Sequence, residues 1–513
     1  MSATVHRSSL GLALGAAAAA IGIWMTWQLS AAGNDALAVG LAASVGLAIY
    51  VYLGERTSAW RYLFPGVAAM LAFVAFPLAY TVQIGFTNYS SNNLLTEARA
   101  RAYLLEQRDF DIASAHAFSV LRGAEGLRLL LAAGDEDPAK PGMERPRLIS
   151  PPLPAAGAAR LTLAPLASSA ADGTPLDLRE VIALRERLRV LQLALPDGRV
   201  LDYAGLREFA AAQPLWREDA DGMLVRTEDG AGFRPNRDTG FFEGPGGEAL
   251  QPGFKVNVGW KNYLRLFGDA DIRGPFMSIF VWTVVFAGLT VLFSTAIGMT
   301  LAVLLNWEAL RFRGLYRTLL FLPYAVPGFI SILVFKGLFN QNFGEINAIL
   351  DALFGVKPAW FADPFLAKVM ILVVNTWLGY PYIMVLCTGL IKAIPADLYE
   401  ASAIAGAGPW TNFRRITVPL IAKPLTPLLI SAFAFNFNNF VLISLLTDGR
   451  PDYLNTKLPA GTTDILVSYT YRIAFTDAGA NFGLAAAIST VIFLLVAVMS
   501  LVNLRLTGEH AKR

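Results

Sequence analysis

Eight apolar stretches, each about as long as a bilayer is thick, constrain what this chain can fold into. A helix needs about 20 mostly apolar residues to cross the hydrocarbon core. The stretches that meet or approach this length are 10–29, 36–53, 62–86, 277–305, 315–338, 366–391, 424–446 and 482–504. Only 16% of the 513 residues are charged, against about 25% in ordinary soluble domains. The sequence therefore predicts a polytopic α-helical membrane protein.

Basic residues flank these spans on one side of the membrane. Arg7 precedes the first span, and further basic residues follow the second, fourth, sixth and eighth spans: Arg56, Arg61, Arg311, Arg313, Arg317, Lys392, Arg414, Arg415, Lys423 and Arg505. Because cytoplasmic loops collect Lys and Arg, both termini are predicted to be cytoplasmic. The first stretch could also be read as a signal peptide, but Trp24 and Trp27 near its end favour an uncleaved span.

A long segment between the third and fourth spans is predicted to fold by itself on the outer side. The predicted organisation is 1–61 with the first two spans, 62–86 as the third span, 87–276 as the insert, and 277–513 as the membrane core. The insert is long enough for its own core, and its strand and turn signals predict an α+β or β-rich domain.

Local patterns give more detail for the insert. Alternating leucines and a Pro-Asp-Gly turn predict a β-hairpin over 191–203, and 229–230 is a second candidate turn. We expect a short helix over 204–212, a helix or a strand over 184–190, and a surface loop over 134–159.

Several functions are disfavoured by what the sequence lacks. The net charge is only +3, which does not indicate a nucleic-acid partner. The three histidines are far apart and there is one cysteine, so we predict no metal site. There is no phosphate-binding loop, so ATP hydrolysis is not expected on this chain, and no catalytic residues are predicted. The central parts of the spans carry no charged residue, which argues against an ion-coupled carrier.

Polar residues and helix breakers interrupt three of the spans. Two prolines and a glycine in the segment 322–328 predict a broken helix, for which a simple packing kink is the alternative. In the sixth span, Asn375, Gly379 and Tyr382 share one helical face, with Leu378 beside them.

The seventh span repeats this combination of rings and amides. Phe435, Asn436 and Asn439 share a face there. Asparagines can also simply join helices. Amides beside aromatic rings, however, suit a neutral polyhydroxylated ligand such as a sugar.

The connection after the sixth span contains a slender helix and a glycine turn. Asp397 is predicted to cap this helix, Ala401 and Ser402 keep it narrow, and Gly406 is predicted to end it. Such a segment can insert into a cleft of another protein, whereas a lipid-binding helix would carry basic and bulky apolar faces.

These residues resemble a known motif, the EAA loop of ABC-importer permeases. The matching positions are Glu400-Ala401-Ser402, Gly406 and Ile416-Thr417-Val418-Pro419, within about 395–420. Ser402 replaces an alanine, and Ala405 stands where many such loops have an acid. With this loop, the eight spans, the insert and the segment 461–475, the chain resembles the larger, MalF-type membrane subunit of maltose/maltodextrin importers.

The resemblance implies specific roles for residues of this chain. Substrate binding would fall to Tyr324, Asn375, Leu378, Gly379, Tyr382, Phe435, Asn436 and Asn439. Coupling to an ATPase would fall to Glu400, Ala401, Ser402 and Gly406. Gly328 stands where a hydroxyl residue is expected, so one hydrogen bond to substrate would be missing.

The resemblance also implies partners and a location. A second permease, an ATPase homodimer that holds ATP and Mg²⁺, and a periplasmic sugar-binding protein would assemble with this chain in the bacterial inner membrane and move maltose or maltodextrin inward by alternating access. No cofactor is expected on this chain. The alternatives are a permease for another oligosaccharide, a membrane-protein insertase or assembly factor, and a secondary carrier.

Overall fold

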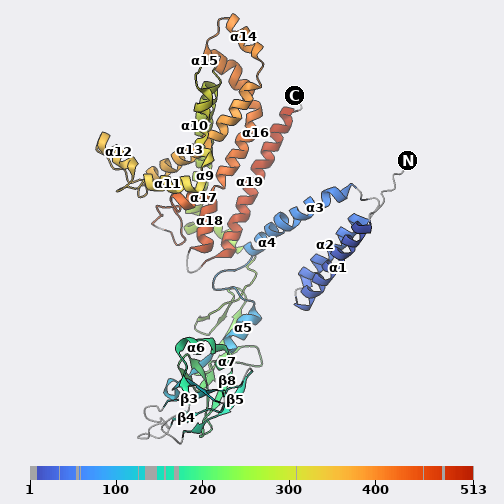
Figure 1. Cartoon of the computed structure of the whole chain (residues 1–513), viewed down its shortest axis with the longest axis vertical. Helices are drawn as coiled ribbons and strands as arrows, with labels where there is room; N and C mark the ends of the chain where they lie inside the picture. The colour runs from blue at the N-terminus through green and yellow to red at the C-terminus, as the bar shows by residue number, and fades with distance from the viewer. Residues whose placement is uncertain are drawn as a thin grey trace. The chain divides into compact units, whose positions relative to one another are not determined.

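The protein consists of two compact units (Figure 1). The computed structural model describes residues 9–33, 35–53, 57, 59–124, 126–132, 147–154, 157–166, 173–307, 309–454, 456–476 and 480–511. Met1–Thr87 and Gly259–Arg513 form one unit, here called the membrane unit. Asn88–Val258 form the other, here called the insert.

The membrane unit is helical throughout its long segments. Its helices are α1 (Ser9–Ala31), α2 (Asp35–Leu53), α3 (Trp60–Met70), α4 (Phe76–Gly85), α8 (Lys261–Gly268), α9 (Ala270–Asn306), α10 (Arg313–Ala325), α11 (Gly328–Leu338), α12 (Glu345–Phe354), α13 (Pro364–Lys392), α14 (Ala396–Ile404), α15 (Pro409–Asn412), α16 (Val418–Phe437), α17 (Phe440–Leu446), α18 (Leu466–Phe475) and α19 (Phe482–Ala511). Single π-helical turns, Leu71–Ala75 and Phe413–Thr417, join α3 to α4 and α15 to α16.

The predicted membrane class is confirmed. Each of the eight predicted stretches is helical. Within the described ranges, five helical segments are long and apolar enough to cross a membrane, and the bent pair α10–α11 adds a sixth if it forms one span. The orientation of the spans stays a prediction, and two of the basic residues behind it, Arg7 and Arg56, lie outside the described residues.

Two of the predicted spans are broken. The chain turns by 90° between α10 and α11, where Val326 is extended, the conformation favoured before a proline, and Pro327 lacks a backbone donor. This confirms the predicted break over 322–328. A second break, between α16 and α17, contains no proline. There Asn439 caps α17, its side-chain oxygen accepting from the Leu442 N–H at 3.4 Å.

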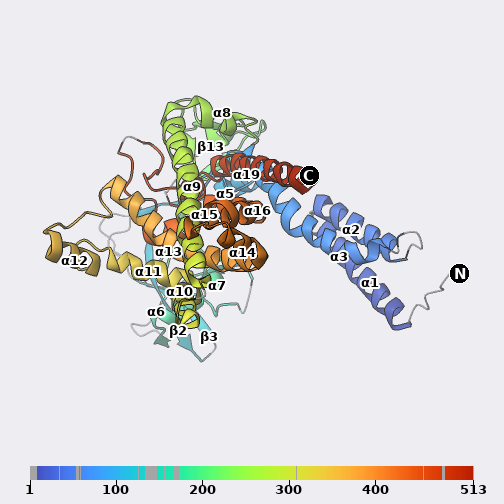
Figure 2. The same cartoon turned by 90° about the horizontal axis from the view of Figure 1, so that it is seen from above.

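The helices α9 and α13 form the centre of the membrane unit and lie against each other in both views (Figure 1, Figure 2). A Cβ at Gly298 of α9 would stand only 2.9 Å from the backbone of Tyr380 and Met384 in α13. Glycine therefore permits this close approach, as small residues do between membrane helices. The helix α16 also packs against this pair.

The insert is built mainly from antiparallel strands. Its strands are β1 (Arg108–Phe110), β2 (His116–Gly123), β3 (Gly126–Leu131), β4 (Leu148–Ile149), β5 (Ala159–Thr162), β6 (Ala164–Pro165), β7 (Thr174–Pro175), β8 (Leu191–Ala194), β9 (Val200–Gly205), β10 (Glu208–Ala210), β11 (Ala212–Pro214), β12 (Trp216–Glu218), β13 (Leu224–Arg226), β14 (Gly232–Asn236), β15 (Phe241–Glu243) and β16 (Ala249–Leu250). Three helices, α5 (Glu97–Leu105), α6 (Leu178–Ala183) and α7 (Arg185–Arg189), accompany them.

The strands form three sheets. The largest has the order β5-β8-β9-β10-β2-β3-β4-β6, with β7 paired to β2; β12 to β16 form a meander, and β1 pairs with β11. One apolar core lies under the large sheet and includes Phe118, Leu193 and Phe209. A second core, with Phe233 and Phe242, lies under the meander. The β-rich domain predicted for this segment is therefore confirmed.

The local predictions for the insert had mixed outcomes. The hairpin over 191–203 is confirmed as β8 paired with β9, and the turn at 229–230 joins β13 to β14. The segment 184–190 is helical, as α7. The helix predicted over 204–212 is wrong: Phe209 is fully buried in β10, which pairs with β9 and β2, so sheet pairing overrides the helix-prone alanines.

Two further predictions concern the edges of the insert. Much of the predicted loop 134–159 lies outside the described residues, while Leu148–Ile149 within it forms strand β4. The segment 259–276 belongs to the membrane unit rather than to the insert. Its residues Leu266, Ile272 and Phe276 are buried in the core formed with α18 and α19, which explains why it does not fold with the strands.

Candidate functional site

One cavity of about 940 Å³ lies within the membrane unit, at the two helix breaks. It is bordered by α9, α10, α11, α13, α16 and α17. The cavity is lined by all eight residues predicted to bind substrate: Tyr324, Asn375, Leu378, Gly379, Tyr382, Phe435, Asn436 and Asn439. The structure thus brings together side chains from three separate predicted spans, although their role in binding stays a prediction.

A network of amides forms the polar wall of the cavity. Asn375 Nδ2 donates to Asn436 Oδ1 at 2.8 Å and to Thr290 Oγ1 at 3.1 Å. Asn439 Nδ2 donates to Asn375 Oδ1 at 3.3 Å, and Asn436 Nδ2 donates to the carbonyl of Ala432 at 2.8 Å. Because Asn375 and Asn436 are buried and largely satisfied by each other, they fix the wall in place.

Aromatic rings form the rest of the cavity surface. Tyr324, Tyr382 and Phe435 come from α10, α13 and α16 and have exposed fractions of 55%, 40% and 71%. Large rings that remain open beside a polar wall can cover the C–H faces of a ligand while amides bind its hydroxyls. The arrangement suits an uncharged, hydroxyl-rich molecule.

The sequence reasoning missed several polar residues of this site, among them two on α9. Thr290 and Ser294 of α9 line the cavity, and both are buried. Thr290 accepts from Asn375, while Ser294 Oγ lies against Gly379, where a Cβ would approach it to 2.8 Å. Their spacing of four residues within the apolar run 277–305 is the signal that could have found them. Gly328 also lines the cavity, without a hydroxyl to offer.

The predicted coupling segment forms the helix α14 followed by a tight turn. Asp397 does not cap this helix: the cap position is Pro395, and Asp397 lies in the first turn, where its charge still favours the helix dipole. Gly406 has φ +74°, in the left-handed region that favours glycine. The amides of Gly406 and Ala407 donate to the carbonyls of Ala403 and Ser402, which closes the helix end.

Side-chain hydrogen bonds hold α14 to the segment that follows it. The hydroxyls of Tyr399 and Thr417 lie 2.9 Å apart, and Ser402 Oγ donates to Asn412 Oδ1. Glu400 and Ala401 are exposed on the helix surface, and Ile404, with an exposed fraction of 90%, lies at its end. Ser402 therefore braces the loop internally, whereas Glu400 and Ala401 are available to another protein.

Two family models match the two units of the chain. The model for the binding-protein-dependent transport system inner membrane component matches residues 294–507, which contain most of the cavity and the whole α14 loop. This defines the class as a multi-pass permease of a binding-protein-dependent transport system. The model for the maltose transport system permease protein MalF P2 domain matches residues 95–259, nearly all of the insert.

Full-length relatives define the family more closely. The chain is 51% identical over 472 residues to the maltose/maltodextrin transport system permease protein MalF of Klebsiella aerogenes, covering 91% of this chain and 90% of that protein. It is 50% identical over 472 residues to MalF of Escherichia coli strain K12, with 91% and 90% covered. The chain belongs to the MalF family of maltose/maltodextrin transport system permease proteins.

Similarity to a solved transporter structure is lower. A bacterial alginate ABC transporter, solved with an alginate pentasaccharide-bound periplasmic protein, is 21% identical with a TM-score of 0.43, covering 50% of this chain and 84% of that chain. The family assignment rests on the full-length relatives and the family models, and it does not favour an insertase.

Proposed function

We propose that this chain is the MalF-type permease subunit of an ATP-driven importer in the bacterial inner membrane. Its cargo would be maltose and maltodextrins, carried from the periplasm to the cytoplasm. The observation that carries this proposal is the cavity at the two helix breaks, which eight residues from three predicted spans line with amides and open rings. Membrane transporters use broken helices at substrate sites because the cavity tolerates irregular backbone there.

In this proposal, the aromatic rings and the amides of the cavity bind different parts of the sugar. Tyr324, Tyr382 and Phe435 would stack on the C–H faces of the glucosyl rings. Asn439 lies at the break between α16 and α17 and is only half buried, so it would bind sugar hydroxyls, while Asn375 and Asn436 hold the wall. Leu378 and Gly379 would shape the floor, with Gly379 keeping α13 close to α9.

Coupling would run through the α14 loop. The proposed partners are a second, MalG-type permease, a homodimer of a MalK-type ATPase and a periplasmic sugar-binding protein. Glu400, Ala401 and the glycine turn at Gly406 would dock into a cleft of the ATPase, and the internal hydrogen bonds of the loop would let it move as one body with α13 and α16. ATP and Mg²⁺ would bind to the ATPase subunits, with no cofactor on this chain.

The experiment that tests the proposal is purification of the chain from native membranes in mild detergent, followed by mass spectrometry and ATPase assays. We expect an ATPase and a second permease to co-purify. Hydrolysis should then rise when maltose-loaded binding protein is added. A panel of maltose, maltotriose, lactose and raffinose distinguishes a maltodextrin importer from a permease for another oligosaccharide. Purification without any ATPase, even after cross-linking, would contradict the proposal.

A further inference from the structure

The insert contains a hollow of about 960 Å³ that the proposed transport role does not use. It is lined by α7, by β5, β8 and β9, and by residues between Tyr103 and Phe110. Its volume is at the upper end of the range for small-molecule pockets, about 300–1,000 Å³. The hollow is therefore large enough for an organic ligand rather than for a single ion.

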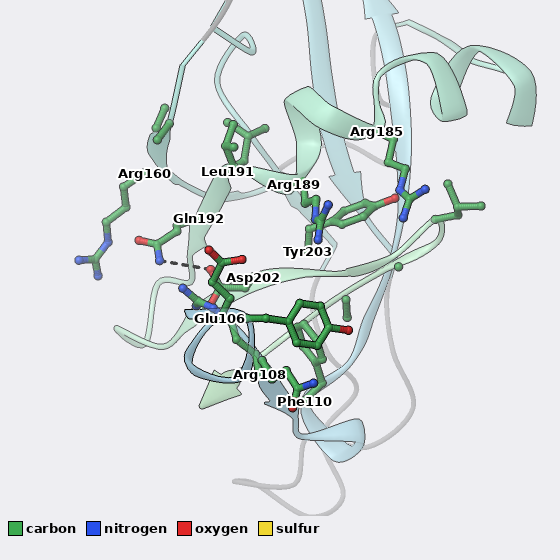
Figure 3. Close-up of a pocket in the computed structure, with 18 residues that line it drawn as sticks. Glu106, Arg108, Phe110, Arg160, Arg185, Arg189, Leu191, Gln192, Asp202 and Tyr203 are labelled. Carbon is green, nitrogen blue, oxygen red and sulfur yellow. Dashed lines mark hydrogen bonds and ion pairs between the residues drawn. The ribbon is translucent and has the colours of Figure 1, made fainter. Parts of the chain in front are cut away.

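Positive charge exceeds negative charge around this hollow. Four arginines line it, against the carboxylates of Glu106 and Asp202. Both carboxylate oxygens of Asp202 already have partners. Oδ2 lies 2.7 Å from Arg108 Nη1, and Oδ1 accepts from Gln192 Nε2 at 3.2 Å (Figure 3). Arg108 and Asp202 therefore neutralise each other as part of the wall.

The three remaining arginines have no such partner. Among the residues that the structure describes, Arg160, Arg185 and Arg189 form no ion pair, and their side chains are exposed. Arg185 and Arg189 are four residues apart in α7 and so share one face. Figure 3 shows Arg160 on the opposite side of the hollow from Arg185. Like charges around one hollow repel each other, and a bound anion would relieve that repulsion.

A buried hydroxyl lies beside two of these arginines. Tyr203 Oη is buried and has no hydrogen-bond partner among the described residues. Burial raises the pKa of Tyr203, and the charge of Glu186 adds to this rise, while the charges of Arg185 and Arg189 act in the opposite direction. Both arginines and Glu186 therefore lie within electrostatic reach of the hydroxyl. Figure 3 shows the hydroxyl end of the ring pointing toward Arg185. An unpaired buried donor is costly, and a ligand oxygen would satisfy it.

We propose that this hollow binds a small organic anion with at least two carboxylate or phosphate groups. Arg185, Arg189 and the Tyr203 hydroxyl hold one anionic group, since two oxygens of a carboxylate or phosphate match the guanidinium fork. Arg160, across the hollow, holds a second. The rings of Tyr103 and Phe110 also line the hollow and cover the carbon skeleton of the ligand.

The test uses the full chain, purified in detergent and titrated calorimetrically with citrate and, separately, with pyrophosphate. Ionic strength is kept constant with sodium chloride. We expect saturable binding of at least one of these probes at a single site. The variant R185Q/R189Q should weaken it at least about tenfold, because charge-assisted hydrogen bonds are lost. The matched control R179Q/R207Q removes two exposed arginines outside the hollow and should leave the affinity within about twofold.

A third variant tests the hydroxyl without changing charge. Y203F should weaken binding about fivefold, yet leave the unliganded protein as stable as before, because that hydroxyl has no described partner to lose. The proposal is overturned if neither citrate nor pyrophosphate binds saturably. It is equally overturned if R179Q/R207Q weakens binding as much as R185Q/R189Q, since the effect would then be one of net charge.

Discussion

At the scale of single residues, the membrane cavity depends on contacts between side chains that are far apart in sequence. Asn375 connects α9 to α16 through Thr290 and Asn436, and Gly379, one turn further along α13, lies against Ser294. Hydrogen bonds alone contribute modestly between membrane helices. The precise fit of α9 against α13 therefore decides the shape of the cavity.

Substituting Gly379 tests this fit. In G379A, the new Cβ would lie 2.8 Å from Ser294 Oγ, so the Ser294 side chain or the packing of α9 against α13 must shift. We expect maltose uptake by vesicles containing the assembled importer to fall several-fold. The double variant S294A/G379A should recover most of the uptake, because the remaining Ser294 Cβ is 3.6 Å away. G389A, where a Cβ meets nothing within 4 Å, is the control. A double variant as impaired as G379A would contradict this explanation.

A second residue-scale prediction concerns the buried ion pair before α18. Asp464 is fully buried; its Oδ2 lies 2.8 Å from Arg472 Nη1, and its Oδ1 accepts from Ser468 Oγ at 2.7 Å. R472L leaves this carboxylate without its cation, which should cost about 3–5 kcal/mol of stability. We expect a lower Tm in detergent at pH 7, and a partial recovery in D464N/R472L. Equal Tm values for R472L and the double variant would contradict the prediction.

The pH dependence follows from the same carboxyl group. Burial raises the pKa of Asp464 from 3.8 to about 6. Because its folded pKa lies above its unfolded pKa, this group contributes most stability below about pH 4 and loses that contribution as the pH rises through 6. Without the Arg472 charge the folded pKa rises further. The Tm deficit of R472L should therefore shrink when the pH is lowered from 7 to 5. D464N/R472L lacks the titrating carboxyl group, so its Tm should not gain from this protonation and its deficit should not shrink.

At the scale of helices and loops, the sequence predicted the elements well where one physical requirement dominates. The thickness of a bilayer requires apolar helices of a certain length. The sequence therefore predicted eight apolar stretches, and each of them is helical. The proline pair predicted the break at α10–α11. The break at Asn439 was missed, because a cap formed by a side chain inside an apolar span leaves no such signal. The prediction of a helix over 204–212 is wrong because the pairing partners of β10, such as His116, are distant in sequence.

The candidate sites were predictable to a similar degree. Residues four apart on a helix predicted which side chains share a face, and the cavity contains all of them. Thr290 and Ser294 were missed because a lone hydroxyl within a long apolar helix is usually satisfied by its own backbone. Which helices meet, and hence that Asn375 bonds to α9, required the tertiary structure.

The turn at the end of α14 gives the prediction at this scale. G406P cannot adopt φ +74°, and it also removes the amide that donates to Ala403. We expect the variant to assemble in the membrane but to lose most sugar-stimulated ATP hydrolysis. G408A is the control, because Gly408 has φ −80° and a Cβ there meets nothing within 4 Å. Normal stimulation in G406P would exclude a coupling role for this turn.

At the scale of the whole molecule, the two units have separate cores, and the boundary between them is testable by deletion. Replacing 89–257 with a short Gly/Ser linker keeps α8 and the start of α9, whose Leu266, Ile272 and Phe276 belong to the membrane core. We expect this variant to insert into the membrane and to assemble with the ATPase. It should lose productive docking of the sugar-binding protein, which is measured as a loss of sugar-stimulated ATP hydrolysis.

The matched deletion of 89–276 removes those three buried side chains as well. It should lower the amount of folded protein in the membrane, since each lost core residue costs roughly 2–5 kcal/mol. If both deletions accumulated equally well, the segment 259–276 would not be part of the membrane core. If the shorter deletion kept full sugar stimulation, the insert would have no part in docking.

Whether maltose passes through this cavity can be measured as uptake of labelled maltose by proteoliposomes containing the assembled importer with F435A. Phe435 lines the cavity with an exposed fraction of 71%, so its removal takes a stacking surface from the sugar with little loss of packing. With about 1–2 kcal/mol lost, uptake at low maltose should fall about 5- to 30-fold. F365A, an equally open ring outside the cavity with an exposed fraction of 72%, should transport normally. Equal uptake by F435A and F365A would mean that maltose does not pass through this cavity.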